Sequence, residues 1–179
     1  MSTTSLSQIP DEEFNATLKL PTGNFSFKAN KINIKGSIDA SGNKCWELQA
    51  FHDILKDSPP QSGLAGIKEV IVIHLYIGDE LSVKHQPLVP SNLPPSVIKN
   101  SGNLFKIVDK KPDKENLIDT IDNYLGIEGI ISYAWNKERT RIKGTFSFLV
   151  LDCDDPRPDT DIQITNGNFN LLNRGQHLI

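Results

Sequence analysis

The acidic run from Asp152 to Asp161 holds the densest set of potential metal ligands in the sequence. Five carboxylates lie in this short span, those of Asp152, Asp154, Asp155, Asp159 and Asp161. Ca²⁺ prefers several carboxylate and carbonyl oxygens from one flexible loop. The sixth-position glycine and the twelfth-position glutamate of an EF-hand loop are absent, however. The run therefore predicts either a calcium site or a solvated hairpin loop stabilised by Asx turns.

Four histidines could act as general bases, and His74 has the most informative surroundings because it lies inside a run of apolar residues. Within a barrel, burial would tune its proton affinity, and Tyr76 or Tyr133 could assist proton transfer. The alternative is a structural histidine that is hydrogen-bonded in the sheet. His85 and His177 lie near loops or the chain end and are interpreted as exposed. No H-x-H or H-E-x-x-H spacing is present, so the sequence does not predict a zinc site.

Four aromatic residues are candidates for a ligand platform: Trp46, Tyr76, Tyr133 and Trp135. At the mouth of a β-barrel they could stack on a sugar or another ring, since barrel mouths are common ligand sites. Ordinary core packing is the alternative, because the four residues lie at alternating strand positions like any core aromatic.

No sequence motif indicates a particular reaction. A G-x-S-x-G serine and a P-loop are absent, and neither Cys45 nor Cys153 lies in a motif. We therefore expect a non-catalytic binding or interaction module whose partner is a small molecule or a protein. A small barrel enzyme of the cyclase or isomerase type is one alternative, with an organic substrate enclosed in the barrel. A Ca²⁺-dependent carbohydrate-binding module that uses the acidic run is another, and no further cofactor is expected.

Composition limits the class of protein. The chain has 179 residues and a net charge of −3 with both signs interspersed, which fits one domain and argues against a nucleic-acid-binding surface. No apolar run is long enough to span a bilayer. The first residues lack the basic and apolar regions of a signal peptide, so we expect a cytoplasmic protein or one exported without such a peptide. Two cysteines make no disulfide framework and are expected to be thiols. A homodimer is compatible with the sequence.

Alternating apolar residues predict that most of the chain forms strands. The stretch 141–151 places large apolar residues on one face and mostly polar residues on the other, after a hairpin loop at 136–140. The run 67–77 is apolar on both faces and predicts a strand buried on both sides. Further strands are expected at 14–20, 25–38, 46–50, 104–108, 131–135 and 162–171, with another beginning at Leu81. In the range 162–171 the alternation slips at Asn166-Gly167, which predicts a bulge with glycine in a left-handed conformation, or else a tight hairpin.

One helix is expected, at 113–125. Asp113 follows Pro112 and can cap it, the apolar residues from Leu117 to Leu125 fall at helical spacing, and Gly126 ends it.

These elements predict a mainly β fold: an antiparallel β-barrel of calycin-like type or a two-layer β-sandwich, with one short α-helix. Residues 1–12 are expected to be a flexible tail and residues 13–179 a single domain. The ending G-T-F-S-F…I-Q-I-T-N-G-N-F-N-L resembles the closing strands of uncharacterised bacterial all-β domains, often lipoproteins. From the first residues we expect neither the signal nor the lipidated cysteine of those lipoproteins. The resemblance implies a β fold and no particular activity.

Overall fold

The computed structural model describes residues 12–55, 67–92, 96–108, 120–153 and 161–174. Every regular element of this part is a strand, and no helix in it is long and apolar enough to cross a membrane. The strands are β1 (Glu13–Leu20), β2 (Gly23–Lys28), β3 (Lys31–Ile38), β4 (Lys44–Leu55), β5 (Ile67–Gly78), β6 (Ser82–Leu88), β7 (Ser101–Val108), β8 (Thr120–Trp135), β9 (Arg141–Asp152) and β10 (Ile162–Leu172).

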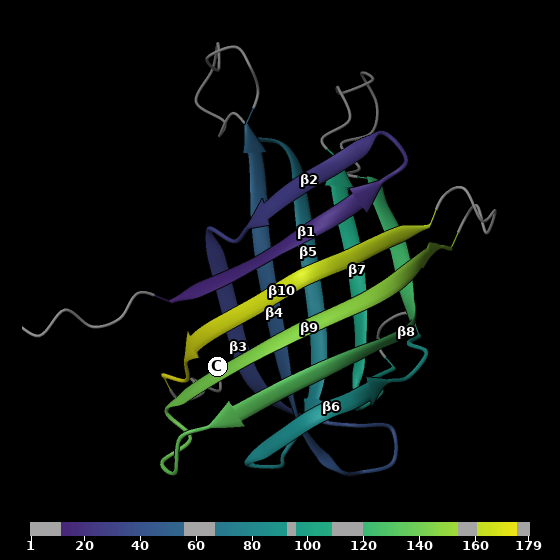
Figure 1. Ribbon diagram of the computed structural model, residues 1–179. Helices are drawn as coiled ribbons and strands as arrows, with labels where there is room; N and C mark the ends of the chain where they lie inside the picture. The colour runs from purple at the N-terminus through teal and green to yellow at the C-terminus, as the bar shows by residue number, and fades with distance from the viewer. Residues whose placement is uncertain (1–11, 56–66, 93–95, 109–119, 154–160, 175–179) are drawn as a thin grey trace, which may run out of the picture.

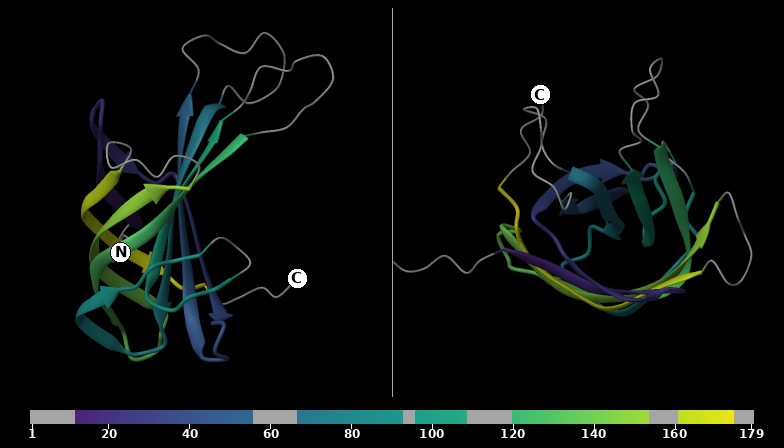
Figure 2. Two further views of the ribbon diagram at one scale, coloured as in Figure 1. Left: turned by 90° about the vertical axis from the view of Figure 1, so that its right-hand side faces the viewer. Right: turned by 90° about the horizontal axis from the view of Figure 1, so that it is seen from above.

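All ten strands form one antiparallel sheet in the order β2-β1-β10-β9-β8-β7-β5-β4-β3, and β6 pairs separately with β8. The sheet curls so strongly that its two halves face each other as layers (Figure 1). The front layer contains β2, β1, β10, β9 and β6, and the back layer contains β7, β5, β4 and β3, whose strands cross those of the front layer obliquely (Figure 2). The expectation of a barrel or sandwich is therefore confirmed in its coarse form, as an antiparallel half-barrel.

β8 belongs to both layers. Residues 120–125 pair with β7, residues 129–134 pair with β6, and β9 accompanies β8 along both halves. Gly126 lies where β8 leaves β7. A Cβ atom there would lie 2.1 Å from the carbonyl oxygen of Gly102, so the two backbones approach too closely for any other residue.

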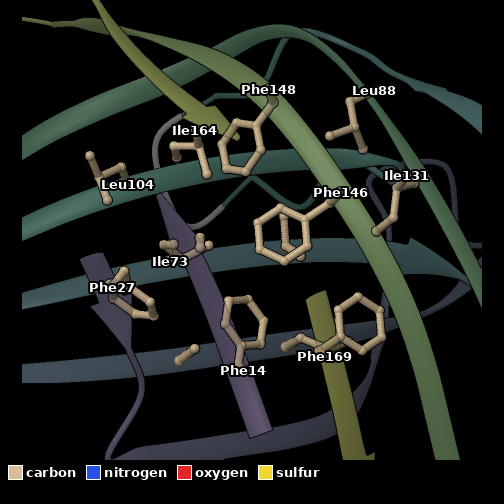
Figure 3. Close-up of a cluster of buried hydrophobic side chains, with 14 of the residues drawn as sticks. Phe14, Phe27, Ile73, Leu88, Leu104, Ile131, Phe146, Phe148, Ile164 and Phe169 are labelled. Carbon is tan, nitrogen blue, oxygen red and sulfur yellow. The ribbon is translucent and has the colours of Figure 1, made fainter. Parts of the chain in front are cut away.

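The core lies between the two layers, where side chains from both converge (Figure 3). It consists of the alternating apolar residues that the sequence placed on one strand face, and it includes Phe14, Phe27, Ile73, Leu75, Leu104, Ile142, Phe146, Phe148, Ile164 and Phe169. Each of these side chains is at most 4% exposed. Burial of this apolar surface stabilises the curled sheet and fills the space between the layers.

Three core phenylalanines lie over glycines of the neighbouring strand. Phe169 faces Gly144, Phe146 faces Gly167, and Phe148 faces Gly129 as direct cross-strand partners. A Cβ atom on any of these glycines would lie 2.3–2.5 Å from the nearest side-chain or main-chain atom. The rings therefore occupy space that only glycine leaves open, which lets the sheet bend tightly around the core.

The predicted bulge in the last strand is confirmed. The register of β10 against β9 shifts between Ile164 and Gly167, and its register against β1 shifts between Asn15 and Thr17. The residue in the left-handed conformation is Asn166, with a φ of 51°, and not Gly167 as expected. Asparagine tolerates this conformation better than most side chains do, and Gly167 is needed instead for its contact with Phe146.

The predicted helix at 113–125 is wrong where it can be checked. Residues 113–119 lie outside the described residues, but residues 120–125 belong to β8. Ile121 points outward and is 52% exposed, whereas Tyr124 points into the core and is 8% exposed, which is the alternation of a strand. Pairing with β7 and β9 supplies the main-chain hydrogen bonds, and this long-range pairing overrides the helical spacing of the apolar residues.

Candidate functional site

His74 and Tyr76 lie on the outer face of the back layer. Their neighbours Ile73 and Leu75 point into the core and are fully buried, so the alternation of β5 directs His74 and Tyr76 away from the barrel interior. On β4 the residues directly opposite them are Gln49 and Glu47. A buried polar cluster forms here from three adjacent strands.

Glu47 is the centre of this cluster. Its Oε1 accepts a hydrogen bond of 2.7 Å from Gln49 Nε2 and lies 3.0 Å from His74 Nε2, while Oε2 lies 3.1 Å from Lys35 Nζ. The distance between His74 Nε2 and Glu47 is that of an ion pair, but the two groups are not aligned for a hydrogen bond. The buried Nε2 atom therefore lacks an aligned acceptor among the described residues. Burial acts to raise the pKa of Glu47, but the contacts with His74 and Lys35 outweigh it and hold this pKa below its usual value.

Tyr76 packs against His74, with 4.4 Å between the ring centroids. Burial, and secondarily the charge of Glu47, raises the pKa of Tyr76 to about 12, so its hydroxyl keeps its proton at neutral pH. His74 and Glu47 are 4% and 6% exposed, and neither lines any of four hollows of about 320–570 Å³ that the described residues form. The cluster thus brings ionisable groups together outside these four hollows.

Three of the four candidate aromatic residues meet at one end of the half-barrel. The Trp46 and Trp135 ring centroids are 4.8 Å apart, and the Tyr133 hydroxyl donates to the carbonyl oxygen of Gly78 and to Glu80 Oε2. Tyr76 is not among them, because it lies on the other face of the back layer.

Asp79 accepts hydrogen bonds from two side chains at this aromatic end. Its Oδ1 accepts hydrogen bonds from Trp46 Nε1 at 2.9 Å and from Arg139 Nη1 at 2.6 Å, and Arg139 Nη2 donates to its carbonyl oxygen. Burial together with Glu80 raises the pKa of Tyr133. These polar contacts tie the β5–β6 turn to the β8–β9 hairpin, and Trp46 and Asp79 line a hollow of about 320 Å³ at this end.

The acidic run can be tested only in part. Asp152 and Asp161 are described, whereas Asp154, Asp155 and Asp159 lie outside the described residues. Within the described ranges no group of three or more histidine, cysteine, aspartate or glutamate side chains is placed to hold one metal ion. The calcium site therefore stays a prediction.

A groove runs along β9 on the outer face of the front layer, the side that faces the viewer in Figure 1. It consists of three successive hollows of about 450, 570 and 370 Å³. The first two share Ser132 and Thr145, and the second and third share Ile130, Ser147 and Thr165. We call this surface the β9 groove.

Two bulges flank the central hollow of the β9 groove. His85 of β6 and Asn166 of β10 both line it, and both have left-handed backbones, with φ of 52° and 51°. Each lies at a register shift of its strand, and the His85 N–H donates to Ser132 Oγ at 2.9 Å. Bulges re-aim side chains at the edges of sheets and beside functional sites. The two bulges thus turn an imidazole and an amide toward one hollow.

The side chains of this groove can hydrogen-bond but carry few charges. The uncharged polar residues that line it are Ser82 and Asn170 in the first hollow, Gln163 in the third, and Ser132, Thr145, Ser147, Thr165, Asn166 and Asn168. Hydroxyl and amide groups both donate and accept hydrogen bonds. The arrangement can bind a polar ligand.

Sequence reasoning did not identify this site. His85 was expected to be exposed near a loop, and Asn166 was expected to belong to a bulge or a tight hairpin, with no ligand assigned to either residue. The alternation slip at Asn166 was the one visible signal. Its relation to His85 depends on the order β6-β8-β9-β10, which joins residues far apart in the sequence.

Comparisons with known protein families, with curated proteins and with solved structures each find no match.

Proposed function

We propose that this chain is a non-catalytic binding module whose ligand lies in the β9 groove. The observation that carries this proposal is the pair of left-handed residues, His85 and Asn166, on opposite sides of the central hollow. A left-handed backbone is uncommon for residues other than glycine, and it carries some strain even in asparagine and histidine, which tolerate it better than most residues do. Such strain is concentrated at ligand-binding and active sites.

The packing between the layers also supports a ligand on the outside. Phenylalanine, leucine and isoleucine side chains fill the interior of the described part, and the buried His74 points away from it. A barrel enzyme with an enclosed substrate is less well supported, because such a reaction needs a cavity beside its acid or base.

The experiment is a ligand screen read by amide chemical shifts of the ¹⁵N-labelled protein, with small molecules, oligosaccharides and peptides. We expect shifts confined to β6, β8, β9 and β10, and loss of binding in Ser147→Trp, which fills the central hollow. The matched control is Ser26→Trp, at an exposed position of β2 on the same outer face. A ligand whose shifts lie elsewhere, or whose affinity Ser147→Trp leaves unchanged, would contradict the proposal.

A protein contact on the outer face of the back layer is the second candidate function. Val70, Phe105 and Ile107 are partly exposed there beside Ile121, which is 52% exposed. A contiguous apolar surface often marks a protein-interaction site. A homodimer would use this face, and light scattering should then show a mass that Ile121→Lys halves. A monomeric mass for the unchanged protein at high concentration would argue against self-association.

A further inference from the structure

The shape of the β9 groove selects for an extended ligand. Its hollows follow one another along β9 from Lys143 to Leu149, with walls from β8 and β10. Six residue steps of a strand span roughly 20 Å. A site of this length is longer than a single small ring, and it fits a linear chain of several units.

The side chains that line the groove favour a ligand that carries uncharged hydroxyl groups. Its middle is formed by Ser132, Thr145, Ser147 and Thr165, each with a hydroxyl that both donates and accepts hydrogen bonds. Charged side chains line only its ends: Glu13, Lys84 and Lys143 at one and Glu128 at the other. An acidic polymer would need a row of arginine or lysine residues along the site.

Apolar contacts are available at one end of the groove. Ile130 is 46% exposed and Leu149 is partly exposed, and both line the third hollow. Such surfaces pack against the C–H faces of a sugar ring, while the neighbouring hydroxyls bond to its edge.

A peptide strand fits this surface less well. Extended peptides bind mainly by adding a strand to a free sheet edge. The β9 groove lies on the side-chain face of three paired strands, where the main-chain hydrogen bonds are already used. The nearby edge strand β6 carries Pro87 and a bulge, and both features oppose strand addition.

We propose that the ligand of the β9 groove is an uncharged linear glycan, an assignment that rests on the binding function proposed above. The glycan lies along β9, and its hydroxyls exchange hydrogen bonds with Ser132, Thr145, Ser147 and Thr165. Asn166 and His85 contact the sugar at the central hollow. The described residues of the central hollow include no carboxylate, so the proposed contact does not use calcium.

The test is native gel electrophoresis of the full chain through gels that contain one polysaccharide each. The neutral probes are laminarin, xyloglucan, galactomannan and dextran, and the charged probes are alginate and polygalacturonate. We expect at least one neutral probe to retard the protein at both low and high salt, since little of this binding is ionic. Ser147→Trp should weaken the retardation by about tenfold or more, while Ser26→Trp should leave it unchanged.

A second blocking variant, Thr145→Trp, keeps the test decisive if Ser147→Trp does not fold. Thr145 is exposed, so a larger side chain there should not disturb the core. Both variants are first shown to melt as the unchanged protein does. Retardation that neither variant weakens, or none with any neutral probe, overturns the glycan assignment. If a charged polymer or a peptide instead shifts the groove amides in the screen above, the ligand class is wrong and the binding function stands. If the screen finds no ligand for the groove, both proposals fail.

Discussion

Gly144 and Phe169 face each other across β9 and β10, and a Cβ atom on Gly144 would lie 2.3 Å from Phe169 Cζ. The ring of Phe169 thus occupies the place of the missing side chain. Ser132 O would lie 2.6 Å from the same Cβ, so a main-chain atom of β8 also restricts the position.

We therefore expect Gly144→Ala to lower the free energy of unfolding by about 1–3 kcal/mol, as overpacking of a core does. Urea denaturation measures the change, and Thr145→Ala is the control at the next, outward-facing position, with an expected effect within about 0.5 kcal/mol. Phe169→Leu in the Gly144→Ala background should recover part of the loss relative to the sum of the two single changes. Equal midpoints for Gly144→Ala and the unchanged protein would show that the ring can move aside.

Glu47 should make stability depend on pH in the acid range. Its pKa in the folded protein is below the unfolded value of about 4.3, so its stabilisation is complete above that pH and is lost as the pH falls through the folded-state pKa. Glu47→Gln should cost about 1–3 kcal/mol at pH 7, because His74 and Lys35 lose a charged partner.

The measurement for Glu47 is urea denaturation of both proteins from pH 7 down to pH 3. The difference between them should shrink as the carboxylate of the unchanged protein is protonated. Glu128→Gln, at an exposed position of β8, controls for the general effect of removing a negative charge. Curves that stay parallel over the whole range would assign the stability loss to a cause other than this charge.

Asp79 should stabilise the aromatic end of the half-barrel. Asp79→Ala removes the acceptor of both Trp46 Nε1 and Arg139 Nη1, and we expect a loss of about 1–3 kcal/mol together with a shift of the tryptophan emission maximum. Glu138→Ala, in the same hairpin but exposed, is the control. An emission spectrum identical to that of the unchanged protein would mean that Trp46 is not bonded to Asp79 in solution.

Because the backbone of Asn166 is left-handed, the stability of the protein should depend on which residue stands at this position. Asn166→Val is expected to cost about 1–2 kcal/mol, because a β-branched side chain is strained at a φ of 51°. Asn166→Gly relieves that strain and should be close to neutral, although it also removes an amide from the groove. Thermal melts of the two variants check the order, and a Val variant as stable as the Gly variant would refute the left-handed assignment.

Strands were predictable from this sequence wherever one face meets the core. In β1 and β9 the alternation of Phe14, Leu18, Phe146 and Phe148 is direct, since the inner face is apolar and the outer face is mostly polar. The start of β8 fails this pattern because both of its faces carry apolar residues. Helical spacing from Leu117 to Leu125 then fits equally well by local rules, and only pairing with β7 decides against a helix.

The candidate site was harder to predict than the fold. His74 and Tyr76 were recognised as unusual, but the face to which they point depends on which side of β5 meets the core. His85 and Asn166 gave no joint signal, because β6 and β10 are brought near each other only by β8 and β9 between them. Register and bulges, which no local spacing specifies, determine the groove.

The pairing of β1 with β10 has a consequence for synthesis on the ribosome. Asn15 and Asn168 face each other but are 153 residues apart in the chain. At a synthesis rate of about 5–20 residues per second, β1 waits roughly 8–30 s for its partner. During this interval the apolar side of the β1–β2 hairpin, with Phe14, Leu18 and Phe27, has no β10 beside it.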